Sequence, residues 1–372
     1  GGSACFSVDR SRLWAVEARV ERVLDRFARC ERAHGRLCHF DAGGVPRRAE
    51  LDRRLSTLDP LERARALTDL VVTSVLLDAG AGDRWRYRDG DAVLSRSEGL
   101  AVASLRLFLA GAFASDGAEL RCDASALESV TSHRLAAALD VRPDNPLVGL
   151  EGRAHLLSSL GAALSARPEL FGSRARPGNL VDWARARASA GSISARTLLA
   201  GILDGLSPIW PGRASLHGEN LGDVWPHPAL GEGAEGLVPF HKLSQWIVYS
   251  LVEPLAVAGL AVSELDSLTV LAEYRTGGLL VDLGVLELAD ASLVSRALSV
   301  GDAAVVEWRA LTVALFDEIV PSLLVRAARR TSPAHARSLV ELAAWTAGRE
   351  VARELRPCGG PPLRVESDGT VF

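Results

Sequence analysis

The chain has 372 residues, of which 48% are hydrophobic and 24% are charged, and its formal net charge is −4. This composition is typical of a globular protein and excludes intrinsic disorder, and a core of this size needs neither disulfides nor a metal to hold it. The acidic balance argues against DNA or RNA as a partner, because nucleic-acid binding takes most of its affinity from basic residues that neutralise phosphates.

The cysteines indicate the compartment. There are five, an odd number, and they are scattered without a repeated spacing, which is typical of reduced thiols in a cytoplasmic protein. No apolar run reaches the ~18 residues that a membrane-spanning helix needs. We therefore expect a cytoplasmic protein that does not insert into a membrane.

Helical periodicity dominates the chain, so we predict a single, mainly α-helical domain. Apolar residues follow helical spacing in 11–33 and again in 60–79, which begins after Asp59-Pro60 and ends at Gly80. Asp89-Gly90 lies between alternating residues in 84–94 and predicts a small β-hairpin. Further helices are expected at 97–113, 126–139, 150–165, 192–205, 240–259, 277–287, 301–328 and 334–355, with one or two short strands in the C-terminal tail.

A possible metal site lies early in the chain. Cys30, His34, Cys38 and His39 would recur about once per turn if the first helix continued through them, and such spacing can present metal ligands on one face. A half-buried helix with two cysteines gives the same pattern, and no second ligand pair follows. We expect no metal and no cofactor.

Two segments in the middle of the chain combine polar and aromatic residues. Ser97 is a good N-cap for the helix at 97–113, and Arg96 and Glu98 beside it either face a ligand or simply begin a core helix. The irregular stretch 206–236 is long enough to be functional. Its members that could line a small-molecule pocket, or only fasten the loop to the core, are Trp210, Arg213, Asp223, Trp225 and His227.

The segment 236–254 predicts a ligand-facing helix. Lys242, Gln245 and Tyr249 fall at i, i+3 and i+7 and form a polar stripe with apolar residues on both sides. A polar stripe is normally a solvated face. An amide and a phenol between apolar flanks are also what a binding stripe inside a helical bundle contains, so we predict that these three side chains line a pocket.

The segment 263–286 indicates a tight helix–turn–helix, broken at Gly277-Gly278. Glu273 and Arg275 lie next to this turn. A carboxylate between apolar helices is a candidate for acid–base chemistry or for stabilising a cation, although an exposed ion pair would have the same sequence. The two glycines would let a sugar approach the backbone closely.

Several strings resemble the uracil-catabolism family that is assigned to the ribosylurea step. They are SVLLDAGAG (74–82), RSEGLAVAS (96–104), DNPLVGLEGRA (144–154), PIWPGR, GDVW, PFHKLSQW, EYR-GGLL (273–280), EWRALTVAL (307–315), TAGRE and SDGTVF. The resemblance covers a core at 59–372 within the single domain 1–372. The N-terminal helical segment 1–58 departs from it, because GRLCHFDAGGV (35–45) lacks the longer stretch that family members carry before this point.

A remoter resemblance is to the queuosine-5′-phosphate N-glycosylases. Phe240-His241-Lys242-Leu243-Ser244-Gln245 resembles their F-Y-K-R-A-Q, and Leu268 to Arg275 followed by Leu283 to Leu286 resembles their L-T-x-x-A-D-Y-R and L-G-V-L strings. The resemblance implies a helix-hairpin-helix fold like that of DNA glycosylases. It also implies that Glu273 takes the place of the catalytic aspartate, with His241 among the substrate contacts. Asp is replaced by Glu here, and V-P-Q by Thr276-Gly277-Gly278.

Together the two resemblances imply an N-ribosyl hydrolase that releases urea from ribosylurea or its 5-phosphate. Such a reaction passes through an oxocarbenium-like transition state that a carboxylate stabilises, and a proton donor assists the poor leaving group. Asp223 and Glu98 are possible donors. The expected partner is a small ribosyl substrate, and other uracil-catabolism enzymes are further candidates. The alternatives are a binding or scaffold protein of the same pathway and a glycosylase acting on another modified nucleoside or nucleotide.

Overall fold

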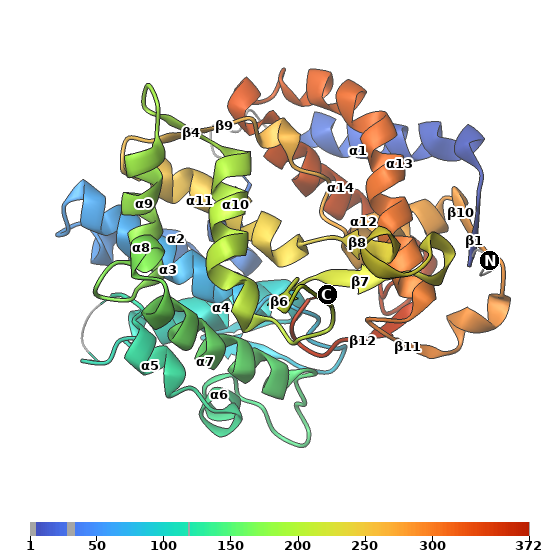
Figure 1. The fold of residues 1–372 in the computed structure, drawn as a ribbon. Coiled ribbons are helices and arrows are strands. Elements are labelled where there is room, and N and C mark those ends of the chain that lie inside the picture. The colour runs from blue at the N-terminus through green and yellow to red at the C-terminus, as the bar shows by residue number, and fades with distance from the viewer. Residues whose placement is uncertain (1–4, 28–33, 118–119, 372) are drawn as a thin grey trace.

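A computed structural model describes residues 5–27, 34–117 and 120–371 of the chain. Helices account for most of the described residues, so the protein is mainly α-helical, as predicted (Figure 1). The α-helices are α1 Leu13–Arg26, α2 Arg47–Arg54, α3 Pro60–Leu76, α4 Arg96–Leu109, α5 Ala124–Glu128, α6 Ser132–Ala138, α7 Leu150–Ala166, α8 Pro168–Phe171, α9 Leu180–Arg187, α10 Ala195–Leu206, α11 Lys242–Val257, α12 Tyr274–Asp282, α13 Ala303–Ala327 and α14 Pro333–Leu355.

The strands are short and pair only two at a time. The pairs are β1 Phe6–Val8 with β10 Leu286–Leu288, β2 Tyr87–Asp89 with β3 Ala92–Leu94, β4 Ser192–Ser194 with β9 Ala261–Ser263, β5 Ser215–Leu216 with β6 Glu219–Asn220, β7 Val224–Pro226 with β8 Leu237–Pro239, and β11 Ala297–Ser299 with β12 Arg364–Glu366. The β2–β3 pair is the hairpin predicted at 84–94, and Gly90 takes a φ of 60° in its turn. The strand β12 confirms a short C-terminal strand.

The helices α3 and α11 pack together at the centre of the molecule. Every residue of α3 from Ala66 to Leu76 is buried, and so is every residue of α11 from Leu243 to Val252. A helix that is covered on all sides belongs to the interior rather than to one surface. Buried hydrophobic side chains from Phe6 to Val371 form one cluster in the described part of the chain, as expected for a single domain.

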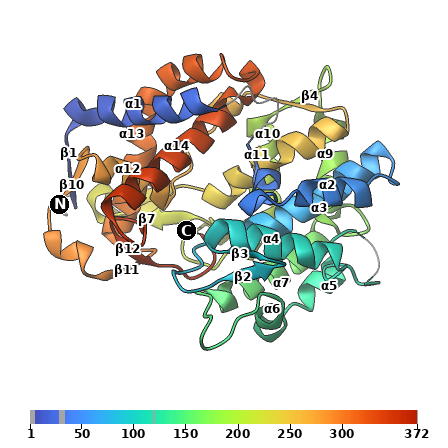
Figure 2. The same cartoon turned by 180° about the vertical axis from the view of Figure 1, so that it is seen from behind.

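The remaining helices gather in two groups on either side of this pair. The helices α1, α12, α13 and α14 pack on one another, while α4, α7 and α9 pack near α3 (Figures 1 and 2). The stretch after α3, the start of α4, the start of α11 and the stretch before α12 lie where the two groups meet. These segments supply most of the residues of the candidate site.

Some predicted boundaries are wrong. The first helix, expected at 11–33, ends at Arg26, and residues 28–33 of that expectation lie outside the described part of the chain. The pattern at 126–139 contains two short helices, α5 and α6. The helix α4 begins at Arg96 after Ser95, so Ser97 is not its N-cap. The helices α2 and α9 were not expected, because both are short and rich in arginine, which weakens their apolar pattern.

The helix–turn–helix expected at 263–286 is also wrong. Residues 265–267 form a short 3₁₀ helix, and α12 then runs unbroken through Gly277 and Gly278. A Cβ atom on Gly277 would meet Thr312 Oγ1 at 2.6 Å, and one on Gly278 would meet Pro362 at 3.0 Å. The two glycines therefore allow α12 to pack closely against its neighbours, and they do not break a helix or admit a sugar. The likeness to helix-hairpin-helix glycosylases finds no support in this segment.

In the described part of the chain, no helix combines the length and the apolar character that crossing a membrane requires.

Candidate active site

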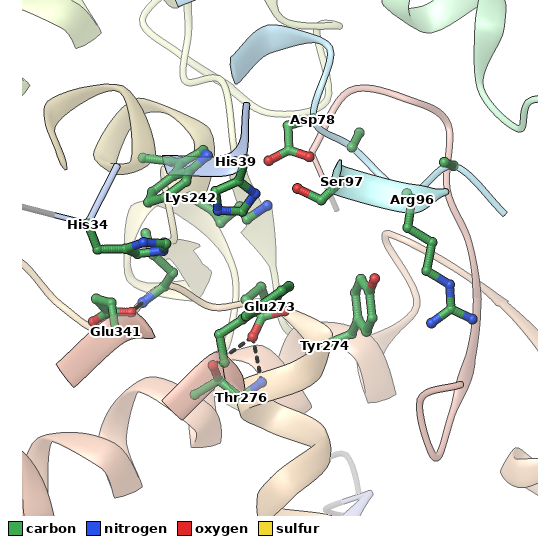
Figure 3. A pocket seen from close by; sticks show the side chains of 16 residues that line it. His34, His39, Asp78, Arg96, Ser97, Lys242, Glu273, Tyr274, Thr276 and Glu341 are labelled. Carbon is green, nitrogen blue, oxygen red and sulfur yellow. Dashed lines mark hydrogen bonds between the residues drawn. The ribbon is translucent and has the colours of Figure 1, made fainter. Parts of the chain in front are cut away.

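A small cavity of about 80 Å³ lies where the two groups of helices meet, and side chains from six segments of the chain line it (Figure 3). Its lining residues are His34, His39, Asp78, Ala79, Gly80, Ala81, Arg96, Ser97, Lys242, Trp246, Leu271, Glu273, Tyr274, Thr276, Glu341 and Trp345. Glu273 and Lys242, which come from different predicted motifs, thus share one cavity. The size of the cavity suits a small molecule rather than a polymer.

Glu273 is the N-cap of α12. Its Oε2 accepts a hydrogen bond from the backbone N–H of Arg275 at 2.8 Å, and its Oε1 accepts from the N–H and the hydroxyl of Thr276 at 2.5 and 2.6 Å (Figure 3). The positive end of a helix favours a negative charge at this position. The carboxyl group is therefore fixed in orientation at the cavity wall.

Glu341 is a second cavity carboxylate with a different environment. It lies on α14, its side chain is only 4% exposed, and Oε2 accepts from the backbone N–H of Leu271 at 3.2 Å. Burial raises the pKa of Glu341 to about 7; the Arg337 guanidinium, 3.1 Å from Oε1, offsets this only in part, and the charge of Glu273 adds to the rise. Near neutral pH this carboxyl can hold a proton and give it up.

Lys242 and Asp78 bring opposite charges to the cavity. The ammonium group of Lys242 makes no hydrogen bond to another residue in the part of the chain that the structure describes, and burial lowers its pKa. Asp78 forms an ion pair with the buried Arg36 at 2.7 Å, and Arg36 also donates to Ser97 at 3.0 Å. Lys242 is thus left available to a ligand, while Asp78 is held in place from behind.

Aromatic rings form another wall. His34 and His39 have ring centres 5.4 Å apart, and each lies within 6 Å of the ring of Trp246. His39 also lies 5.9 Å from Trp345. Burial lowers the pKa of both histidines, that of His39 to about 3, so both rings are neutral at physiological pH. This side of the cavity is therefore uncharged and largely aromatic.

Only part of the metal site considered from the sequence can be placed. Cys38 is exposed and Cys30 lies outside the described residues. Within residues 5–27, 34–117 and 120–371, no group of three or more His, Cys, Asp or Glu side chains is placed to hold a metal ion.

Two members of the predicted polar stripe lie behind the cavity instead of lining it. The Gln245 amide donates to the carbonyl of Phe240 at 3.0 Å and to the hydroxyl of Thr269 at 2.9 Å, so it fastens the segment that leads to Glu273. The hydroxyl of Tyr249 accepts from Arg337 at 3.2 Å, and Arg337 pairs with Glu341. Neither side chain is among those that line the cavity, because the stripe faces the interior and only its first turn reaches the cavity.

The loop residues at 210–228 also lie outside the lining. Asp223 is buried and pairs with Arg309 through two contacts of 2.8 Å, and it accepts from the indole of Trp225 at 2.7 Å. Arg309 lowers the pKa of Asp223 to about 2 despite burial, which argues against Asp223 as a proton donor. Trp210 and Trp225 are core residues. The interpretation that they fasten the loop to the core fits their positions.

His241 precedes α11 with a left-handed φ of 49° and does not line the cavity. Its burial lowers the pKa of the imidazole. The backbone N–H of Lys242 donates to Asp223 at 3.0 Å, so Asp223 orients the start of α11. The loop contributes to the site by positioning Lys242.

Arg96, Glu98 and Arg275 surround an adjoining hollow. Glu98 pairs with Arg349 through contacts of 2.6 and 3.0 Å, and Arg275 donates to the carbonyl of Gly359 at 2.5 Å. Only Arg96 of these three also lines the first cavity. In the view of Figure 3, Tyr274 stands between Glu273 and Arg96.

The residue-by-residue interpretation missed several lining residues. Asp78 lies in the string SVLLDAGAG, and Trp345 directly precedes TAGRE, so these strings marked the segments without showing which side chain faces the cavity. Glu341 had no local signal, since a single glutamate in a long helix normally faces solvent. His34 and His39 were noticed only for their spacing.

The amino-acid sequence matches a known protein family and two named relatives. A family profile described as "Protein of unknown function (DUF1688)" matches residues 1–372. The chain belongs to this family. It is 40% identical over 346 residues to Protein urg3 of Schizosaccharomyces pombe, and 39% identical over 375 residues to Uracil catabolism protein 4 of Lachancea kluyveri; each match covers 91% of this chain and 84% of the relative.

Proposed function

We propose that the protein takes part in uracil catabolism as an N-glycosidase, which hydrolyses the N-ribosyl bond of ribosylurea or its 5-phosphate to urea and the sugar. The observation that carries this proposal is the pair of carboxyl groups at one small cavity, Glu273 bound by the N–H groups that begin α12 and Glu341 buried on α14. Burial raises the pKa of Glu341 to about 7. The name of the relative from Lachancea kluyveri supports the pathway.

Two carboxyl groups with different protonation states are what glycosidic hydrolysis requires. Glu341 would donate its proton to the urea nitrogen while the C–N bond breaks, and the electron pair of that bond would leave with urea. Glu273 would stabilise the positive charge that develops on the sugar. Water then adds to the sugar carbon, and its proton returns to Glu341. One molecule of substrate and one of water yield one of urea and one of sugar.

The other lining residues would hold the substrate. The ammonium of Lys242 is a point charge suited to a sugar hydroxyl, and Asp78 can accept from another. Trp246 and Trp345, with the neutral histidines, would keep bulk water from the cationic transition state. The proposed reaction uses no metal ion, so we expect full activity after dialysis against a chelator.

Urea release by the purified protein tests the proposal. Ribosylurea and its 5-phosphate are each incubated with the wild-type chain and with Glu273→Gln, and urea is measured by urease-coupled ammonia detection. Urea from at least one substrate, with the variant strongly impaired, is the expected result. If either compound binds tightly but no urea is released, the hydrolase proposal is contradicted and a binding or scaffold function is supported.

A further inference from the structure

A hollow rich in arginine adjoins the candidate active site. Its volume is about 360 Å³, and it shares Arg96, Ser97, Tyr274 and Trp345 with the first cavity. The arginines in its wall come from four parts of the fold: Arg86 before β2, Arg96 at the start of α4, Arg275 on α12, and Arg349 and Arg353 on α14. A molecule that occupies both spaces would pass across this shared rim.

Only part of this positive charge is neutralised. The carboxylates in the same wall are Asp83, which pairs with Arg96 at 2.7 Å, and Glu98, which pairs with Arg349. Five arginines and two carboxylates leave three guanidinium charges without a carboxylate among the described lining residues. Arg86 and Arg275 are fixed by backbone carbonyls, which orient a guanidinium without cancelling its charge.

Arg353 is the most available of these cations. It is exposed, and it forms neither a hydrogen bond nor an ion pair with any residue that the structure describes. The neighbouring charge of Arg349, followed by burial and by Arg275 and Arg96, lowers its pKa. Like charges gathered in this way repel one another, and a bound anion would relieve the repulsion.

The start of α4 adds to the attraction for an anion. Arg96 has a φ of 55°, a left-handed conformation that costs free energy for a residue with a side chain. This conformation sets the first turn of a 14-residue helix against the hollow, with Ser95 and Ser97 in the wall. A strained backbone conformation persists only where the surrounding structure enforces it, and such conformations are concentrated at ligand-binding sites.

We propose that this hollow binds the phosphate of a phosphorylated sugar, so that the substrate of the adjoining cavity is the 5-phosphate and not the free riboside. The inference rests on the proposed function for the sugar's position. A guanidinium group can donate two hydrogen bonds to a pair of phosphate oxygens. Three unneutralised guanidinium charges attract a phosphate dianion more strongly than they attract a ligand with a single carboxylate. A neutral riboside would leave the repulsion among the arginines in place.

Binding of ribose 5-phosphate, ribose and inorganic phosphate, measured by isothermal titration calorimetry, tests the site without turnover. Ribose 5-phosphate should bind at least tenfold more tightly than ribose, inorganic phosphate should compete with it, and its affinity should fall with added salt. Arg353→Gln should weaken ribose 5-phosphate at least tenfold. Arg329→Gln removes another exposed arginine, one that has no described side-chain partner and does not line the hollow, and it should leave the affinity for ribose 5-phosphate unchanged. Equal binding of the two sugars, or no effect of Arg353→Gln, would overturn the proposal.

Urea release separates this inference from the proposed function. One outcome is that ribose 5-phosphate binds selectively, that this binding depends on Arg353, and that neither compound releases urea. This outcome supports the phosphate site and contradicts only the proposed hydrolase activity. A second outcome is that ribosylurea and its 5-phosphate release urea at equal rates, and that both rates are unchanged in Arg353→Gln. This outcome supports the hydrolase activity and contradicts the phosphate site. A higher kcat/KM for the 5-phosphate, lowered at least tenfold in Arg353→Gln, supports both.

Discussion

At the scale of single residues, Glu273 has two roles that one substitution can separate. Its carboxylate caps α12 through backbone N–H groups, and it faces the cavity. Gln keeps the size and an acceptor oxygen but removes the charge, so Glu273→Gln should bind substrate yet lose about 10²–10⁴ in kcat. Urea release is measured at matched folding by circular dichroism.

The control for the capping role is Asp59→Asn. Asp59 caps α3 by accepting from Leu61 and Glu62 N–H at 2.9 and 3.0 Å, and it does not line the cavity. Both variants should cost no more than about 1–2 kcal/mol of unfolding free energy, whereas only Glu273→Gln should lose turnover. Equal turnover in Glu273→Gln and the wild type would remove Glu273 from the chemistry.

Glu341 should give the reaction its pH dependence. The acid form is the proton donor, and its pKa is raised to about 7. Below this pH the group is protonated and competent, so kcat should fall as pH rises through about 7. Glu341→Gln should lower kcat by about 10²–10⁴ and remove this alkaline limb.

The matched variant for Glu341 is Glu253→Gln. Glu253 also pairs with an arginine, Arg48, at 2.6 Å, but it is only partly buried, lies on α11 and does not line the cavity. Its pH–rate profile should match that of the wild type. An alkaline limb that survives in Glu341→Gln would assign the proton donor to another group.

At the scale of secondary-structure elements, the close packing of α12 depends on Gly277. An alanine there would place Cβ 2.6 Å from Thr312 Oγ1 and 2.9 Å from the buried Trp308 indole nitrogen. The helix preference of alanine, about 1 kcal/mol, is smaller than the overpacking cost, roughly 1–3 kcal/mol. Gly277→Ala should therefore lower the unfolding free energy in urea denaturation and shift Glu273, which caps the same helix.

The comparison for this variant is Gly212→Ala. No atom lies within 4 Å of the position a Cβ would take at Gly212. Its unfolding free energy should stay within about 1 kcal/mol of the wild-type value. If the two alanine variants are equally stable, close packing is not the reason for glycine at 277.

At the scale of the whole molecule, the buried ion pair of Asp223 with Arg309 joins the loop, the start of α11 and α13. Removing one member leaves the other charge buried, so Asp223→Ala should cost about 3–5 kcal/mol. Glu318→Ala breaks the pair with Arg10, in which the two side chains are 65% and 41% exposed, and should cost less than about 1 kcal/mol.

This ion pair should also give stability a definite pH dependence. The pKa of Asp223 is about 2 in the folded protein, below the ordinary value of 3.8. Its contribution is present above pH 4 and is lost as pH falls toward 2. The difference in unfolding free energy between wild type and Asp223→Ala should narrow over this range. A constant difference would mean that the ion pair does not cause the destabilisation.

The sequence alone determined the mainly helical fold, the hairpin at 84–94 and most of the long helices, because these depend on apolar spacing and capping that are local. It also singled out Glu273 and Lys242 from different motifs. Glu341, His34 and Trp345 entered the site only through the tertiary structure. Which face of a buried helix meets a cavity is decided by long-range packing of α3, α11, α12 and α14. Burial, which that packing creates, is the main cause of the raised pKa of Glu341.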